Sequence, residues 1–151
     1  MKLPKNISAL VKQDPVKALA LCEEIKASIS KTTFDSRSMV NHAHKVISDK
    51  VAHLNIERYC CAIYDSGKRF RKLYVGPEGD NDSAVIFLRR LFKCVLDNDG
   101  QYIVVGHNHP SGNLSPSSED FEGQKQIKKA CFLFGISDTH MIVSSSGMIL
   151  F

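Results

Sequence analysis

The sequence predicts an α/β domain of the α+β type, in which a mixed sheet is flanked by helices. Residues 53–151 carry the main evidence, because their apolar periodicity indicates the order strand, strand, helix, strand, helix, strand, strand. Residues 1–52 show helical periodicity alone, so we expect an N-terminal helical segment that packs against the domain or extends from it. The chain has 151 residues, 43% hydrophobic and 24% charged, and can bury a core without disulfides.

The N-terminal segment is expected to contain several helices. Apolar residues recur every three or four positions from residue 6 to residue 29, and the Asp14-Pro15 pair is expected to divide this stretch in two. Ser38 can cap a further helix. His42 and His44 on that helix have no acidic or cysteine partner nearby in the sequence, so we expect surface or packing residues rather than metal ligands.

Two strands joined by a tight turn are predicted at the start of the domain. The first is the apolar and aromatic run 59–64, and the second extends from Phe70 to Val75. Asp65-Ser-Gly-Lys68 has the composition of a hairpin connection. The basic residues around the second strand are expected to keep an exposed strand soluble. The elements expected after this hairpin are a helix at 83–97, strands at 102–105, 141–143 and 148–151, and a helix that ends near Gly135.

The helix before Gly135 has start and stop signals in the sequence. Ser115 can cap it, with Pro116 at the first helical position, where the missing N–H costs nothing. Glycine at 135 suits the left-handed conformation in which many helices end. A loop at 110–116 joins this helix to the preceding strand, and we expect the loop to form a wall of the substrate cleft.

The five cysteines indicate a reducing environment. Their number is odd and no Cys-x-x-Cys spacing occurs, which argues against a disulfide framework and against a thiolate zinc site. Four cysteines lie in apolar runs and are expected to be reduced core residues: Cys60, Cys61, Cys94 and Cys131.

No apolar run approaches the roughly 18 residues needed to span a bilayer, and no signal-peptide pattern begins the chain. We therefore expect a cytoplasmic protein without a membrane partner.

The net charge of +4 is concentrated in the N-terminal segment. Residues 1–52 hold nine Lys or Arg and five Asp or Glu, whereas residues 53–151 hold eleven of each kind. A mildly basic segment permits contact with nucleic acid but does not require it. A solvated helical surface is the simpler interpretation.

The functional centre is predicted at residues 107–120. His107 and His109 follow an apolar strand, and histidines two positions apart on an extended segment point to the same side. Asp120 lies eleven residues beyond His109, just inside the predicted helix. Two imidazoles and a carboxylate leave a zinc ion one open coordination position, which is the arrangement of a catalytic site.

Ser117 is a second candidate functional residue in the same stretch. It lies three residues before Asp120, so both side chains share one face of the predicted helix. Its hydroxyl can donate a hydrogen bond to a developing oxyanion or can cap the helix. Both roles are compatible with its position in the sequence.

The spacing His-x-His, seven residues, Ser-x-x-Asp resembles the signature of the JAMM metalloproteases at every specified position. The text of residues 107–120 is similar in particular to the RadC branch of that superfamily, and the resemblance covers residues 53–151. It implies a JAB/MPN fold, related to that of cytidine deaminases, with Zn²⁺ as cofactor. It also implies hydrolysis of a peptide or isopeptide bond.

The same resemblance implies a glutamate general base upstream of the histidines. In this family the glutamate stands just before a strand of the core sheet, and Glu57 occupies that setting before the predicted strand at 59. Glu78, in a Gly/Pro-rich loop, is the alternative. Glu57 would activate water for attack on the carbonyl and return the proton to the leaving amine, with zinc and Ser117 stabilising the oxyanion.

Three departures from the RadC pattern affect the functional interpretation. The family's His-Pro-Arg-Glu segment is replaced at residues 82–90, and its Asp-His pair becomes Asp138-Thr-His140, so we expect His140 to support the site or to have a structural role rather than bind metal. No helix-hairpin-helix pattern is evident in residues 1–50.

The alternative function is a metal-binding accessory module without peptidase turnover. It would act with DNA-repair or mobile-element machinery through the basic N-terminal helices.

Overall fold

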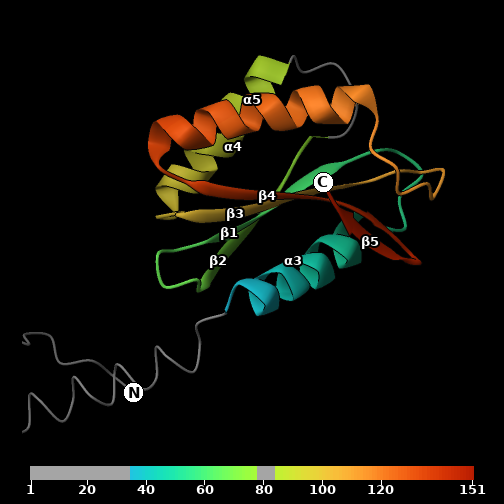
Figure 1. The fold of residues 1–151 in the computed structure, drawn as a ribbon, viewed down its shortest axis with the longest axis horizontal. Coiled ribbons are helices and arrows are strands. Elements are labelled where there is room, and N and C mark those ends of the chain that lie inside the picture. The colour runs from blue at the N-terminus through green and yellow to red at the C-terminus, as the bar shows by residue number, and fades with distance from the viewer. Residues whose placement is uncertain (1–34, 78–83) are drawn as a thin grey trace, which may run out of the picture. The chain divides into compact units, whose positions relative to one another are not determined.

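The computed structural model describes residues 35–77 and 84–151, in which five strands form one sheet and three helices cover it (Figure 1). The predicted mixed sheet flanked by helices is therefore confirmed. The helices predicted before residue 30 lie outside the described residues. The elements are α3 Ser36–Val51, β1 Tyr59–Tyr64, β2 Phe70–Val75, α4 Ala84–Asp97, β3 Tyr102–Asn108, α5 Ser118–Phe134, β4 Ser137–Ser144 and β5 Gly147–Leu150.

The strands are arranged in the order β2-β1-β3-β4-β5. Strands β3 and β4 are parallel, whereas the other neighbouring pairs are antiparallel. A parallel pair needs a crossover connection, and α5 provides it between β3 and β4. The pairing of β1 with β3 places Tyr59 opposite His107, so the residues that precede β1 lie beside the end of β3.

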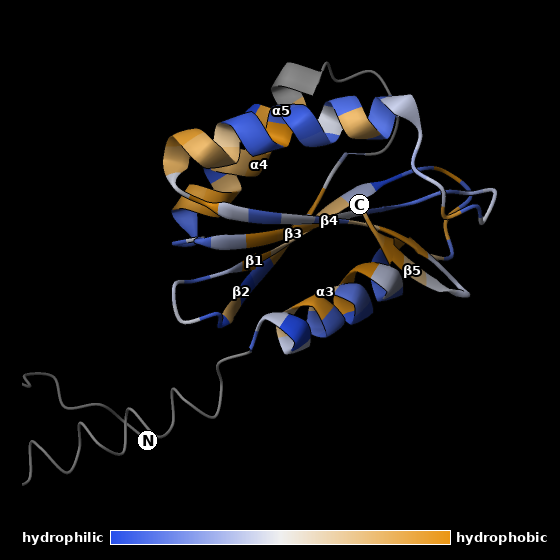
Figure 2. Cartoon of the chain, in the orientation of Figure 1, coloured by the Kyte–Doolittle hydropathy of each residue, from blue (hydrophilic) through white to orange (hydrophobic). Residues whose placement is uncertain are grey.

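Helix α3 covers one face of the sheet, and α4 and α5 cover the other (Figure 1). Strand alternation divides the side chains of β1 between the two layers, with Ala62 toward α3 and Ile63 toward α4 and α5. Figure 2 shows hydrophobic residues along the central strands and on the side of α3 that faces them. Helix α3 thus packs against the sheet through one stripe of buried residues spaced four apart: Met39, Ala43, Ile47 and Val51.

The start of each flanking helix corrects one expectation. Asp35, not Ser38, is the N-cap of α3, because its carboxylate accepts a hydrogen bond from the Ser38 backbone N–H. Helix α5 begins at Ser118 with Ser117 as its N-cap, so the expected cap at Ser115 is wrong. The reason is the reciprocal hydrogen bonding between Ser117 and Asp120, which fixes the first turn two residues later.

The predicted end of α5, the turn between β1 and β2, and the packing role of His42 are confirmed. Gly135 ends α5 in the left-handed conformation, with φ of 66°. The Asp65 carboxylate accepts hydrogen bonds from two backbone N–H groups of the β1–β2 turn. His42 is a packing residue whose ring contacts Tyr64 and Phe70.

None of the helices in the described ranges is long and apolar enough to cross a membrane. The cysteines of the described residues are free, with Cys60, Cys61 and Cys131 buried and Cys94 partly buried.

Gly106 allows α3 to approach the centre of the sheet closely. A Cβ atom at this position would lie 2.9 Å from Met141 Cγ and 3.1 Å from Ile47 Cγ2. We expect Gly106→Ala to lower the free energy of unfolding by about 1–3 kcal/mol, because overpacking a dense core forces its neighbours apart. Chemical denaturation measures this change.

Gly123 on α5 provides the matched control for that substitution. A Cβ atom there would meet nothing within 4 Å. Gly123→Ala is therefore expected to raise the free energy of unfolding by up to about 1 kcal/mol, through its higher helix propensity. Equal effects of the two substitutions would contradict the close packing at Gly106.

Candidate metal centre

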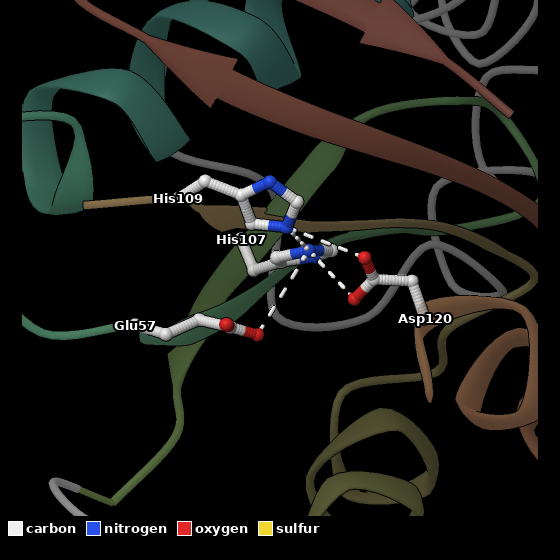
Figure 3. A group of neighbouring side chains, drawn as sticks. All are labelled: Glu57, His107, His109 and Asp120. Atoms are coloured by element: carbon white, nitrogen blue, oxygen red, sulfur yellow. Dashed lines mark hydrogen bonds and ion pairs between the residues drawn. The ribbon is translucent and has the colours of Figure 1, made fainter. Parts of the chain in front are cut away.

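Strand β3 delivers the two histidines of the candidate site. Ile103 and Val105 pack in the core under α4 and α5, and His107 points to the same side because side chains alternate along a strand. His107 is only 2% exposed, and His109 follows just beyond the strand end. The Nε2 atoms of the two histidines lie 3.0 Å apart (Figure 3), as expected from their spacing in the sequence.

Helix α5 delivers Asp120 from its first turn. Its Oδ1 atom lies 2.9 Å from His107 Nε2, and its Oδ2 atom lies 3.2 Å from His109 Nε2. Two further groups hold the carboxylate, because the Tyr59 hydroxyl donates to Oδ1 at 3.1 Å and the Ser117 backbone N–H donates to Oδ2 at 2.7 Å. Asp120 is buried, so its orientation is fixed by the protein rather than by solvent.

Ser117 has a capping role that the sequence left open. Its Oγ atom accepts a hydrogen bond from the Asp120 backbone N–H at 3.1 Å, and the Asp120 side chain bonds back to the Ser117 N–H. This capping box ties the start of α5 to a carboxylate of the site. A hydroxyl has one donor and two acceptor lone pairs, so capping leaves its O–H available.

Glu57 comes from residues 52–58, the connector between α3 and β1. Its Oε1 atom lies 3.9 Å from His107 Nε2, and its side chain is 44% exposed. One ligand-type atom from each of Glu57, His107, His109 and Asp120 lies within 4.8 Å of the others (Figure 3). The structure therefore brings together the predicted base and the three predicted ligands. The alternative base, Glu78, lies outside the described residues.

The donor set suits a divalent metal ion. Neighbouring ligands of a tetrahedral zinc ion are about 3.3 Å apart, given bond lengths of about 2.0–2.1 Å. The two Nε2 atoms lie 3.0 Å apart, and each ring lies within a few tenths of an ångström of that spacing from its nearest Asp120 oxygen, which is Oδ1 for His107 at 2.9 Å and Oδ2 for His109 at 3.2 Å. His109 Nδ1 lies 2.8 Å from the Asn113 carbonyl oxygen and must donate to it, which leaves Nε2 without a proton in the neutral ring.

Electrostatics favour the protonation states that a metal requires. Burial lowers the pKa of His107 to about 4, despite the opposing Asp120 carboxylate, so its imidazole is neutral at physiological pH. Burial opposes ionisation of Asp120, but the hydrogen bond from the Ser117 backbone N–H and the nearby His107 hold its pKa below the usual range. A neutral imidazole and a carboxylate are the forms that bind a metal ion.

Two residues near the centre were not identified from the sequence. The Tyr59 ring stacks on the His107 imidazole at 4.5 Å between centroids, and burial together with the Glu57 and Asp120 carboxylates raises its pKa, so its hydroxyl stays a donor. The Phe151 ring packs in T-shaped arrangements with the rings of His107 and His140, at 6.2 and 5.9 Å between centroids. The alternation of side chains along β1 was the available sequence signal for Tyr59. The position of Phe151 depends on the fold of the C-terminal residues.

His140 lies outside the four-residue group. Its Nε2 atom is 2.9 Å from Asp138 Oδ2, and the side chain is buried. Burial lowers the pKa of His140 against the opposing effect of Asp138, so this ring also stays neutral. His140 is therefore not part of the group of described residues that could hold a metal ion, and its supporting or structural role stays a prediction.

Comparison with known proteins places this geometry in a family context. A family model described as a RadC-like JAB domain matches residues 35–151. A UPF0758 protein of Finegoldia magna is 28% identical over 103 residues, which cover 68% of this chain and 46% of the relative. A UPF0758 protein of Thermosynechococcus vestitus is 25% identical over 95% of this chain and 60% of the relative. The chain spans about half the length of the curated relatives it matches.

Proposed function

The chain belongs to the RadC-like JAB domain family, and from this membership and its four ligand-type side chains we propose that it is a zinc-dependent hydrolase that cleaves a peptide or isopeptide bond. The observation that carries the proposal is the meeting of Glu57, His107, His109 and Asp120 within 4.8 Å. Three groups of ligand type plus a nearby carboxylate are what a hydrolytic metal site needs.

The geometry supports a division of roles between three ligands and a base. The nearest nitrogen and oxygen atoms of each pair among His107, His109 and Asp120 lie 2.9–3.2 Å apart, and each residue is held by the protein or buried in it. Glu57 stands further away, at 3.9 Å from His107, and is more exposed than the other carboxylate. A group that exchanges protons with water and substrate needs this access, which supports the proposed role of Glu57 as general base.

The proposed reaction is divided among these residues. A bound zinc ion supplies Lewis-acid chemistry, in that it lowers the pKa of water toward neutrality and polarises the substrate carbonyl. Glu57 takes a proton from the attacking water and returns it to the leaving amine. The Ser117 hydroxyl donates to the developing oxyanion while its oxygen continues to accept the Asp120 backbone N–H.

Two substitutions at Ser117 separate its capping role from its proposed role as an oxyanion donor. Ser117→Ala is expected to lower the free energy of unfolding by about 0.5–2 kcal/mol, whereas Ser117→Gly costs only a few tenths, since glycine is tolerated at an N-cap. Both remove the hydroxyl, so both are expected to lower kcat by about 10²–10³-fold. Denaturation and steady-state kinetics measure the two effects. A Ser117→Gly variant with unchanged kcat would leave capping as the only role of this residue.

The proposal is tested by elemental metal analysis of the purified protein together with a hydrolysis assay. The probes are a fluorescence-quenched peptide library and a peptide joined through a lysine ε-amine. We expect about one zinc ion per chain and cleavage of one of the two substrate types, both lost after treatment with a chelator and restored by Zn²⁺. Retained zinc without cleavage of any probe would count against the hydrolase.

A second candidate function is a metal-binding accessory module that contacts nucleic acid. It is favoured by the excess of basic residues in 1–52, nine against five acidic ones. Such binding would weaken steeply as salt rises, because the contacts would be to phosphates. DNA binding measured at two salt concentrations, in parallel with the hydrolysis assay, distinguishes the two functions.

A further inference from the structure

The residue between the two histidines points to the opposite face of the sheet. Along β3, His107 faces the layer of α4 and α5, whereas Val104 packs in the layer of α3 and Gly106 stands against Ile47 of that helix. Alternation places Asn108 on the α3 side with them. Asn108 is 1% exposed, so its amide cannot be satisfied by solvent and must find partners inside the protein.

Those partners lie in the connector that carries Glu57. Asn108 Nδ2 donates to the carbonyl oxygens of Leu54 and Ile56, at 3.2 and 3.0 Å. Asn108 Oδ1 accepts from the Arg58 backbone N–H at 3.0 Å. The orientation of the amide is unambiguous, because carbonyl oxygens only accept and a backbone N–H only donates. The three hydrogen bonds of this one side chain thus hold the backbone on both sides of Glu57 in the sequence.

The connector depends on such contacts for its path. Residues 53–58 belong to neither helix nor strand, and pairing of β1 with β3 begins only at Tyr59. The Asn108 amide bridges the end of β3 to the connector before that pairing starts. The distance between Glu57 and His107 is therefore set by the same strand that carries the histidines.

We propose that Asn108 is a positioning residue. Through the connector backbone, it holds the Glu57 carboxylate at a fixed distance from the metal ligands. This inference rests on the proposed function, in which Glu57 is the general base. The tripeptide 107–109 then contributes twice to the centre: its outer residues supply two of the three ligands, and its middle residue fixes the base from the other face. A base displaced by about 1 Å can lose about 10²-fold in rate, so a clamp of this kind affects turnover directly.

The test compares Asn108→Ala and Asn108→Asp with the wild-type full chain. The aspartate keeps the shape of the side chain and the acceptor for Arg58, but it directs an oxygen at the Leu54 and Ile56 carbonyls. We expect both variants to retain zinc, because all three ligands remain. We expect kcat to fall by about 10–10²-fold with KM nearly unchanged. Hydrogen exchange of the Arg58 amide should accelerate in Asn108→Ala, which lacks its acceptor.

A double substitution tests whether Asn108 acts through Glu57. If it does, Asn108→Ala combined with Glu57→Gln is no slower than Glu57→Gln alone, because the clamp has no base left to hold. A further additive loss in the double variant would overturn the inference. So would unchanged kcat in both Asn108 variants, or unchanged hydrogen exchange of the Arg58 amide in Asn108→Ala.

Ile103→Val is the matched control for a purely structural effect. Ile103 is a buried residue of the same strand, at the end away from the centre, and its shortening is expected to leave kcat and Arg58 exchange unchanged. If Asn108→Ala does not fold, Asn108→Ser is measured in its place, since its hydroxyl can still donate to one carbonyl.

A readout without turnover separates this inference from the proposed function. The Glu57 side-chain carboxyl ¹³C resonance, assigned by its loss in Glu57→Gln, should shift on addition of Zn²⁺ in the wild type and shift less in Asn108→Ala. Absence of hydrolysis in the wild type with this difference intact rejects the hydrolase but supports the clamp. Equal shifts in the two proteins reject the clamp, whether or not the wild type is active.

Discussion

Glu57→Gln is expected to retain zinc and to lose hydrolysis, with kcat lowered by about 10²–10⁴-fold. The amide has nearly the same shape as the carboxylate but cannot accept a proton from water at neutral pH. The buried candidate ligands His107 and Asp120 are untouched, and the Glu57 side chain is 44% exposed, so the fold should be unaffected. Elemental analysis, steady-state kinetics and thermal unfolding of the same preparation measure the three quantities.

Glu122→Gln is the control for Glu57→Gln. Glu122 is an exposed carboxylate on α5 that pairs with Lys125, and it lies outside the group of Glu57, His107, His109 and Asp120. Its substitution should change neither kcat nor zinc content. A Glu57→Gln variant as active as this control would remove Glu57 as the base, whereas loss of zinc from it would make Glu57 a ligand instead.

His109→Ala is expected to abolish tight zinc binding. Removal of a partner that merely orients a metal ligand typically costs 10–100-fold in affinity, and loss of a ligand should exceed that. His109 is the less buried of the two histidines and lies beyond β3, so the apo fold should survive its truncation. Competition against a chromophoric chelator measures the affinity, and hydrolysis should fall to background with it.

Zinc should also stabilise the wild type but not His109→Ala. A ligand that binds only the folded state at 100 times its Kd adds about 2.7 kcal/mol to the free energy of unfolding. The midpoint of thermal unfolding should therefore rise on addition of Zn²⁺ in the wild type and stay constant in the variant. His53→Ala, which truncates an exposed histidine of the connector, should respond like the wild type. A zinc response in His109→Ala equal to that of the wild type would contradict the ligand assignment.

The local features of this protein were readable from the sequence because their physical causes are local. Four-residue spacing on α3 and alternation on β1 follow from the geometry of helices and strands. Glycine at 135 ends α5 because it adopts the left-handed conformation without strain. The spacing of His107, His109 and Asp120 within fourteen residues likewise predicted their meeting.

The helix starts were predicted less well, because several polar residues compete to cap the same turn. Asp35 caps α3 in place of Ser38, and Ser117 caps α5 in place of Ser115. In both cases the deciding hydrogen bonds form only once the surrounding backbone is placed. In the case of Ser117 the selecting partner is Asp120, itself a residue of the candidate metal centre.

By itself, the sequence determined the order of elements in the domain and the identity of three candidate metal ligands. Glu57 was assigned through family resemblance, since nothing local distinguishes it from a solvated carboxylate. Only the tertiary structure decided its distance from His107, which depends on the register of β1 with β3 and on the Asn108 hydrogen bonds across about fifty residues of sequence. Register between strands that are far apart in the sequence is specified by the burial of their faces, so it is fixed only when the sheet packs against its helix layers.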